Sequence, residues 1–126
     1  MNLTRLAYDQ HPRPPQRDLR QRGVFDSGVR LVGQVANIYV DDDRTFRFIG
    51  VAMRHGLVGF RKKYHLVPIE AVAEAEPDSV TLKVDRQAVE GAPTLSDPHA
   101  APDERLQRAA REHCVLAMAS SGAWRQ

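Results

Sequence analysis

Apolar and polar positions alternate through the middle of the chain in short runs that are separated by turn signals. The run Leu31–Val40 and the run Thr45–Met53 are rich in the β-branched and aromatic residues that are typical of strands. A third run, Tyr64–Val67, ends at Pro68, which has no amide hydrogen to donate to a neighbouring strand. This order of runs and turns predicts a β-meander.

The first of these runs changes phase along its length. Val35 falls on one face of the expected strand, whereas Ile38 and Val40 fall on the other. A strand that keeps all three inside must accommodate an extra residue, so we predict a β-bulge near Ala36–Asn37. Gly33 in the same strand should allow another backbone or a ring to approach closely.

Strand alternation also predicts which side chains face a shared interior. In the second run, Phe46 and Phe48 fall on one face and Ile49 and Val51 on the other, and a later strand is expected at Val80–Val84. Short strands can bury their apolar faces only if the sheet closes on itself or meets another layer. We expect a small barrel with a single interior formed by Val35, Ile38, Val40, Leu66, Val72, Val80, Leu82 and Val84.

Helical patterns appear only in the last third of the chain. A single helical turn is expected at Asp85–Glu90, and a longer helix from Pro102 to about Ser120, with acidic residues at its positive N-terminal end. The longer helix has a stripe rich in small residues, made of Leu106, Ala109, Ala110, His113, Cys114, Ala117 and Met118. Such a stripe can pack on the same chain's barrel or pair with another copy as a homo-oligomer, and the sequence leaves both open.

The N-terminal 22 residues show no apolar periodicity. They carry five arginines and three prolines among polar residues, which predicts a disordered or extended tail. The tail is interpreted as a solvated leader, with a basic arm that touches RNA as the alternative. In either case its deletion should leave folding intact.

Composition and charge narrow the classes of function. The 126 residues are 42% hydrophobic and 27% charged, as in a soluble globular domain, and no apolar run approaches the length that spans a bilayer. The net charge of +2 comes from the tail, so the rest of the chain is not expected to attract nucleic acid with its whole surface. The single cysteine fits a reducing compartment. These features predict a cytoplasmic protein without membrane insertion.

The stretch Arg54–Lys63 is the main candidate for binding. We expect a long loop or hairpin tip there, and its cations suit a phosphate or an acidic partner, while its aromatic side chain could add a stacking ring. The simpler interpretation is a soluble loop with glycines where the backbone needs them. The candidate binding residues are Arg54, Phe60, Arg61, Lys62 and Lys63.

Other polar residues are interpreted as structural. The acidic turn Asp41–Asp43 lacks the spacing of a calcium-binding loop, so we expect a hairpin turn in which aspartate binds its own backbone. His65 is interpreted as a hydrogen-bonded structural residue, and Cys114 as a small buried hydrophobe. Neither a nucleophile with an activating base nor a metal-ligand pattern can be named, so no catalytic residue, metal or cofactor is expected.

Several short motifs, in order, resemble those of the PRC-barrel family, which is named after the photosynthetic reaction-centre H subunit. They are Gly33-Gln34-Val35, Ile38-Tyr39-Val40-Asp41, Tyr64-His65-Leu66-Val67-Pro68 with Ile69-Glu70-Ala71-Val72, the strand Val80–Val84, and Ala92-Pro93. The resemblance covers about residues 23–95. It implies a small, strongly bent β-barrel of about six strands that serves as an adaptor, and it implies no catalytic residues, because the family shares none.

Known settings of this barrel are the cytoplasmic part of the H subunit and the C-terminal half of a ribosome-maturation factor that binds a small-subunit ribosomal protein. Many other members are stand-alone bacterial proteins without an assigned role. The polar stretch before the barrel lacks a membrane helix and is too short for the maturation factor's N-terminal domain, so we expect a departure from both settings.

We therefore expect an all-β protein with a disordered tail at residues 1–22, a PRC-type barrel at 23–95, a linker at 96–101 and a helix at 102–121. The expected function is a non-enzymatic adaptor for an unidentified protein partner. The alternative is an RNA- or ribosome-associated factor that uses the tail and Arg61–Lys63. An enzyme ranks third.

Overall fold

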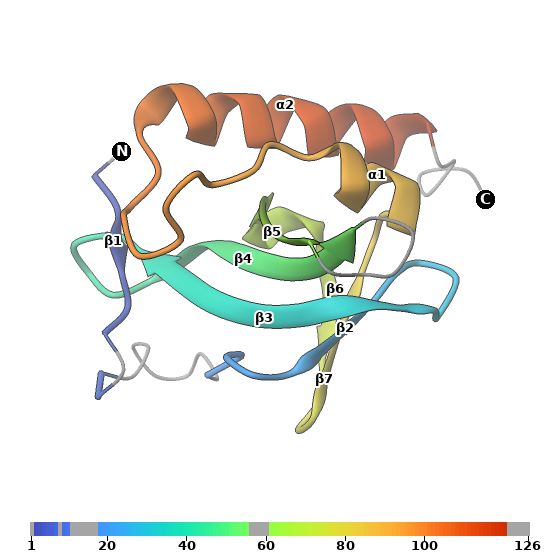
Figure 1. Cartoon of the computed structure of the whole chain (residues 1–126), viewed down its shortest axis with the longest axis horizontal. Helices are drawn as coiled ribbons and strands as arrows, with labels where there is room; N and C mark the ends of the chain where they lie inside the picture. Colours follow the sequence, from blue (N-terminus) through green and yellow to red (C-terminus); the bar gives the residue numbers. More distant parts are fainter. Residues whose placement is uncertain (1, 8, 11–17, 56–60, 121–126) are drawn as a thin grey trace.

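A strongly bent seven-stranded sheet with one long helix across it forms the body of the molecule (Figure 1). The computed structural model describes residues 2–7, 9–10, 18–55 and 61–120. Its elements, in chain order, are β1 (Thr4–Arg5), β2 (Gly23–Phe25), β3 (Leu31–Val40), β4 (Phe46–His55), β5 (Arg61–Pro68), the 3-10 turn η1 (Ile69–Ala71), β6 (Val72–Ala75), β7 (Ser79–Leu82), α1 (Arg86–Gly91) and α2 (Glu104–Ser120).

The sheet is mixed and open. Its strands run in the order β5-β4-β3-β2-β7-β6, with β1 paired to β3, and every pairing is antiparallel except β2 with β7. The expected closed barrel is therefore not seen, since β5 and β6 lie at opposite ends of the described order. The predicted C-terminal helix is present as α2, which adds a second layer over one face of the sheet, so the fold is mostly β and not strictly all-β.

Two bulges bend the central strands. In β3, Val35 pairs with Val51 and Asn37 pairs with Gly50, which leaves Ala36 as the extra residue and confirms the predicted bulge. In β4, Phe46 pairs with Val40 and Phe48 with Tyr39, so Arg47 is extra. The second bulge turns Phe46 to the same side as Ile49, and the expectation that Phe46 and Phe48 share a face is wrong.

The bent sheet buries side chains on both faces. The inner face holds most of the predicted core, with Val35, Ile38, Val40, Val80, Leu82 and Val84 buried together and Val72 packed against them. The prediction for Leu66 is wrong, because its cross-strand partner is Gly50, and it lies with Phe48 under α2. Val67, opposite Ile49, faces the inner core instead.

Much of the N-terminal segment is ordered, contrary to the expectation of a disordered tail. Thr4 and Arg5 pair with β3, and the Leu6 amide donates to the Ile38 carbonyl at 2.8 Å. Leu3, Leu6 and Leu19 are buried. Residues 11–17, which contain all three prolines of the tail, lie outside the described part of the chain. The leucines are too sparse to give a periodic signal, but the pairing of β1 with β3 places Leu3 and Leu6, which flank β1, on the core.

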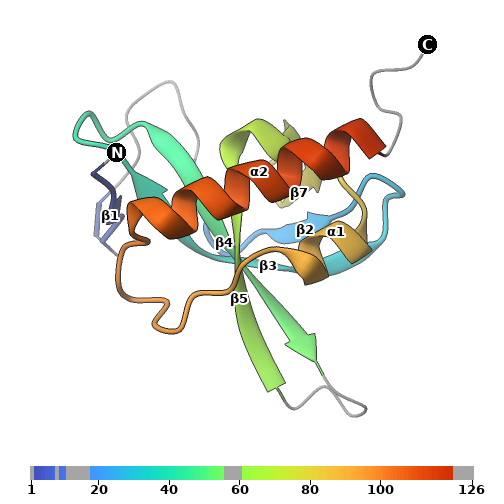
Figure 2. The same cartoon turned by 90° about the horizontal axis from the view of Figure 1, so that it is seen from above.

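Helix α2 lies across the outer face of the sheet, above β5 (Figure 2). It begins at Glu104, and the Leu106 amide donates to the Asp103 side chain at 2.8 Å, which caps its N-terminus. Ala110 and Cys114 are buried, so the predicted stripe packs on its own chain, while Val115 and Leu116 stay exposed. None of the helices described here combines the length and the apolar character that crossing a membrane would require.

Candidate binding site

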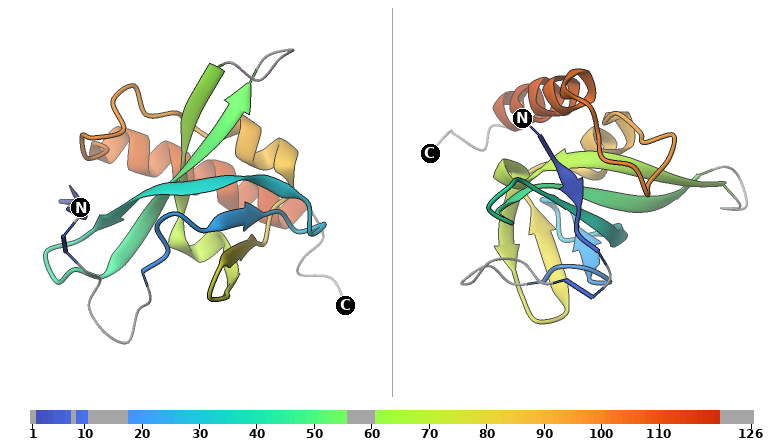
Figure 3. Two further views of the ribbon diagram at one scale, coloured as in Figure 1. Left: turned by 60° about the horizontal axis from the view of Figure 1, so that its bottom comes forward. Right: turned by 90° about the vertical axis from the view of Figure 1, so that its left-hand side faces the viewer.

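A two-stranded arm projects from the sheet where β3 and β4 separate (Figures 2 and 3). The pairing of β3 with β4 stops at Gln34 and Ala52, whereas β4 and β5 stay paired as far as His55 and Arg61. The arm comprises residues 53–55 of β4 and 61–63 of β5. Of the stretch expected as a long loop or hairpin tip, residues 54–55 and 61–63 are strand and continue the β4–β5 ladder. Phe60 lies outside the described residues.

One pair of cations, Arg54 and Lys62, lies directly opposite across the arm. His55 pairs with Arg61. Arg61, Lys62 and Lys63 are all exposed, and the sequence has no acidic residue between Asp43 and Glu70. Like charges directly opposite each other in a sheet lower its stability. The arm therefore retains a charge arrangement that folding alone disfavours.

A hollow of about 290 Å³ lies in the fork between β3 and the arm. Gly33 lies at its base, where an added Cβ would come within 2.3 Å of the Ala52 carbonyl oxygen, which confirms the predicted close approach. We name this cavity the fork hollow. Its lining residues are Leu31, Val32, Gly33, Gln34, Ala52, Arg54, Lys62 and Arg86.

Three cations from three elements meet at the fork hollow. Arg54 comes from β4 and Lys62 from β5, both in the arm, and Arg86 comes from the first turn of α1, where its guanidinium also pairs with Glu90 at 2.8 Å. Leu31, which lines the same hollow, is 59% exposed. The site thus combines positive charge with an accessible apolar side chain.

Asp26 holds Arg86 in this position. Its fully buried carboxylate accepts hydrogen bonds from the backbone amides of Gly28, Arg30 and Arg86, each at 2.9 Å, and from the Arg30 side chain at 3.1 Å. Burial raises the pKa of Asp26, but these donors outweigh it, so its pKa lies below the ordinary value. The ionised carboxylate ties the start of α1 to the β2–β3 turn.

Two histidines meet at the base of the arm. His65 Nδ1 lies 2.9 Å from the Ala92 carbonyl oxygen, and His65 Nε2 lies 2.9 Å from His55 Nε2. A carbonyl only accepts, so His65 Nδ1 carries the hydrogen and His55 Nε2 donates to His65 Nε2. Burial lowers the pKa of His65, which favours this neutral arrangement. The structural interpretation of His65 is confirmed, but its histidine partner was missed.

The sequence contained a partial signal for that pair. His55 and His65 occupy positions of the same parity in the β4–β5 register, so both point to the same side of the hairpin. Their contact could be recognised only after the register was known, because several registers are compatible with a tip of unknown length.

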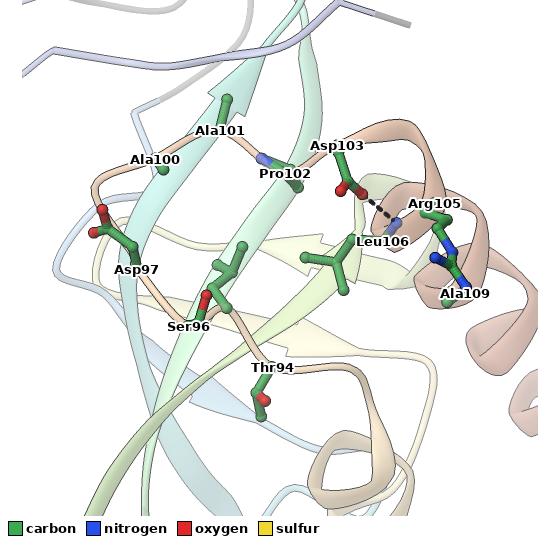
Figure 4. Close-up of a pocket in the computed structure, with 11 residues that line it drawn as sticks. Thr94, Ser96, Asp97, Ala100, Ala101, Pro102, Asp103, Arg105, Leu106 and Ala109 are labelled. Atoms are coloured by element: carbon green, nitrogen blue, oxygen red, sulfur yellow. Dashed lines mark hydrogen bonds between the residues drawn. The ribbon is translucent and has the colours of Figure 1, made fainter.

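A second hollow, of about 490 Å³, lies between the linker and the start of α2 (Figure 4). Its two carboxylates act on their own backbone: Asp97 accepts from the His99 amide, and Asp103 caps α2. Each therefore stabilises a local turn or helix end. Thr94, Ser96 and Arg105 also line the hollow, but no base and nucleophile face each other across it in Figure 4.

The remaining candidates have structural roles in the described part of the chain. The Asp41 side chain accepts from the Asp43 and Thr45 amides at 2.9 and 3.1 Å, which confirms the expected hairpin turn. Burial raises the pKa of Cys114 to about 11, as expected for a small buried hydrophobe. Among the residues described, no three His, Cys, Asp or Glu side chains are grouped to hold a metal.

Arginines of the N-terminal segment bind their own chain. Arg5 donates to the His99 carbonyl, Arg20 to the Ala7 carbonyl and Arg22 to the Glu76 carbonyl. The Arg5 and Arg22 contacts fasten the segment to the body and the Arg20 contact lies within the segment, so these three guanidinium groups are not held out into solvent.

Comparison with known proteins found no family model that matches this chain and no curated protein that matches it. The functional argument therefore rests on the geometry and charge of the arm and the fork hollow.

Proposed function

We propose that this protein is a non-enzymatic binding module, an adaptor of the PRC-barrel type, that recognises an acidic protein partner through the arm and the fork hollow. The observation that carries the proposal is the meeting of Arg54, Lys62 and Arg86 around one cavity. Two of them face each other across the arm and the third comes from α1. A surface that concentrates cations in this way is complementary to an anionic partner.

Two features favour a protein over RNA as that partner. Leu31 places an exposed apolar side chain beside the cations, and apolar contact surface of that kind is typical of protein partners. In addition, arginines of the N-terminal segment are engaged with backbone carbonyls. The motif resemblance to a family of adaptors supports the same proposal.

The proposal is tested by replacing the three cations Arg54, Lys62 and Arg86 with glutamine. Binding of a fluorescent oligoglutamate peptide and of a single-stranded RNA of equal charge is measured by anisotropy at two salt concentrations. We expect the wild type to bind the peptide and the triple variant to bind it at least about tenfold more weakly, because each exposed ion pair contributes up to about 1 kcal/mol.

The matched control replaces Arg105, Arg108 and Lys83, which are exposed and lie off the arm, with glutamine. It makes the same change in net charge, so we expect it to retain peptide binding. Equal losses in the two variants would show that only net charge matters and would overturn the proposal. Tighter binding of the RNA than of the peptide would replace it with the nucleic-acid alternative.

A further inference from the structure

The outer edge of β5 is covered along one half and open along the other. Residues 93–95 cover the C-terminal half of β5. The Leu66 amide donates to the Pro93 carbonyl and the Leu95 amide donates to the Tyr64 carbonyl, both at 2.8 Å. His65 and Thr94 form an antiparallel bridge between these two contacts. The edge of β5 thus already accepts an extended segment of this chain.

The open half lies in the arm. The backbone groups of Tyr64 and Leu66 point away from β4, because they bind residues 93–95. Orientation alternates along a strand, and the β4–β5 register has no bulge, so the N–H and C=O of Lys62 point the same way. In the described part of the chain, neither the Lys62 backbone groups nor the Tyr64 N–H has a hydrogen-bond partner on that side.

We propose that the acidic partner binds as an extended segment that adds a strand to this open edge of β5, paired with the backbone of Lys62 and Tyr64. The inference rests on the proposed function, since it assumes an acidic partner. It further assigns the binding mode, which is strand addition.

The side chains of the arm define what that segment must carry. Lys62 points to the face of the fork hollow, whereas Arg61 and Lys63 point to the opposite face. A segment paired here meets cations on both faces. A run of three consecutive acidic residues places carboxylates against the cations on both faces. A segment with acidic residues only at alternate positions places them on one face only.

The same cations disfavour the other occupants of an open edge. Two copies of β5 placed edge to edge would bring Lys62 and its neighbours against like charges, which opposes self-association. Lysine is a common protection of edge strands for this reason. Protection alone, however, does not require Arg86 of α1 at the same cavity.

The test uses the wild-type protein and a capped peptide of three consecutive glutamates flanked by valines. Amide hydrogen exchange is followed by NMR with and without saturating peptide. We expect exchange at Lys62 and Tyr64 to slow at least about tenfold, because their amides become hydrogen-bonded. Exchange at Lys63, whose amide faces β4, should not change.

A second peptide of the same sequence, N-methylated at alternate residues, keeps the charge but cannot complete the strand pairing. We expect it to bind at least about fivefold more weakly. A peptide that binds without slowing exchange at Lys62 and Tyr64 would overturn strand addition and leave the proposed function standing. Failure of the unmodified peptide to bind would overturn both.

Two variants provide an independent comparison. Lys62→Pro and Lys62→Gln remove the same charge, but only proline also removes the outward amide. The ladder to β4 does not use that amide, so both variants should fold, as checked by circular dichroism. We expect the proline variant to bind the peptide at least about fivefold more weakly than the glutamine variant. Equal affinities would contradict strand addition.

Discussion

At the scale of single residues, Asp26 shows how a turn signal becomes a structural anchor. The Asp26-Ser27-Gly28 turn could be expected from sequence, because aspartate and glycine favour such turns. The sequence could not predict that the Asp26 carboxylate is buried and binds the amide of Arg86, sixty positions away. This contact depends on where α1 begins in space. The fork hollow owes one of its three cations to this bond.

Replacing Asp26 should therefore destabilise the fold. Asp26→Ala leaves three partly buried backbone amides without this acceptor, and we expect the free energy of unfolding to fall by about 3 kcal/mol. Asp26→Asn keeps an acceptor oxygen and should cost less. Urea unfolding monitored by circular dichroism measures both, with Asp78→Ala, at an exposed position, as a control that should cost about 0.5 kcal/mol or less.

The same carboxylate should make stability depend on pH. Its folded-state pKa is depressed, so its stabilisation is fully present above the ordinary aspartate pKa of about 3.9 and is lost as pH falls further. We expect Asp26→Asn to reduce this acid-induced loss. An unchanged acid dependence in the variant would contradict the assigned role.

At the scale of elements, the two bulges explain why one strand was predicted well and its neighbour less so. The β3 sequence changes phase at Val35, which marked its bulge in advance. The β4 sequence is apolar on both faces from Phe48 to Met53, so a shift at Arg47 leaves no phase signal. The sheet is buried on both sides there, and alternation carries information only where one face meets water.

The N-terminal segment contributes to the core through its leucines. Leu6 is 1% exposed and lies in the inner core, so Leu6→Ala should leave a cavity and lower the free energy of unfolding by about 2–5 kcal/mol. Thr4→Ala, at an exposed position of β1, should cost about 0.5 kcal/mol or less. The thermal unfolding midpoints of both variants, compared with that of the wild type, measure the contribution of the segment to stability. Equal midpoints for Leu6→Ala and the wild type would restore the expectation that the segment is dispensable.

At the scale of the whole molecule, local patterns predicted the strands better than their assembly. The strand order of the meander and the cations Arg54, Arg61, Lys62 and Lys63 were visible in the sequence. The sequence did not show whether the sheet would close. Closure depends on residues 93–95, which cover β5, and on α2, which covers the outer face. Arg86 was missed for the same reason, since it reaches the fork hollow only through the packing of α1.

The parallel pairing of β2 with β7 has a consequence for how the chain folds. The paired residues Gly23 and Ser79 are about 56 positions apart, whereas the β3–β4 and β4–β5 pairs close through short turns. Closing a long loop costs more entropy before any contact offsets it. We expect the meander to form in the folding transition state and the β2–β7 contact to form after it.

Kinetic measurements on core variants would reveal this order. Ile49→Val in β4 should mainly slow folding, with a φ-value of about 0.5–0.8, while Val80→Ala in β7 should mainly accelerate unfolding, with a φ-value of about 0–0.3. Stopped-flow chevrons give both values, and the reverse ranking would contradict the expectation. On this route the arm at the end of the β4–β5 hairpin forms early. The fork hollow is completed later, because Arg86 reaches it only when the β2–β7 half of the sheet has formed.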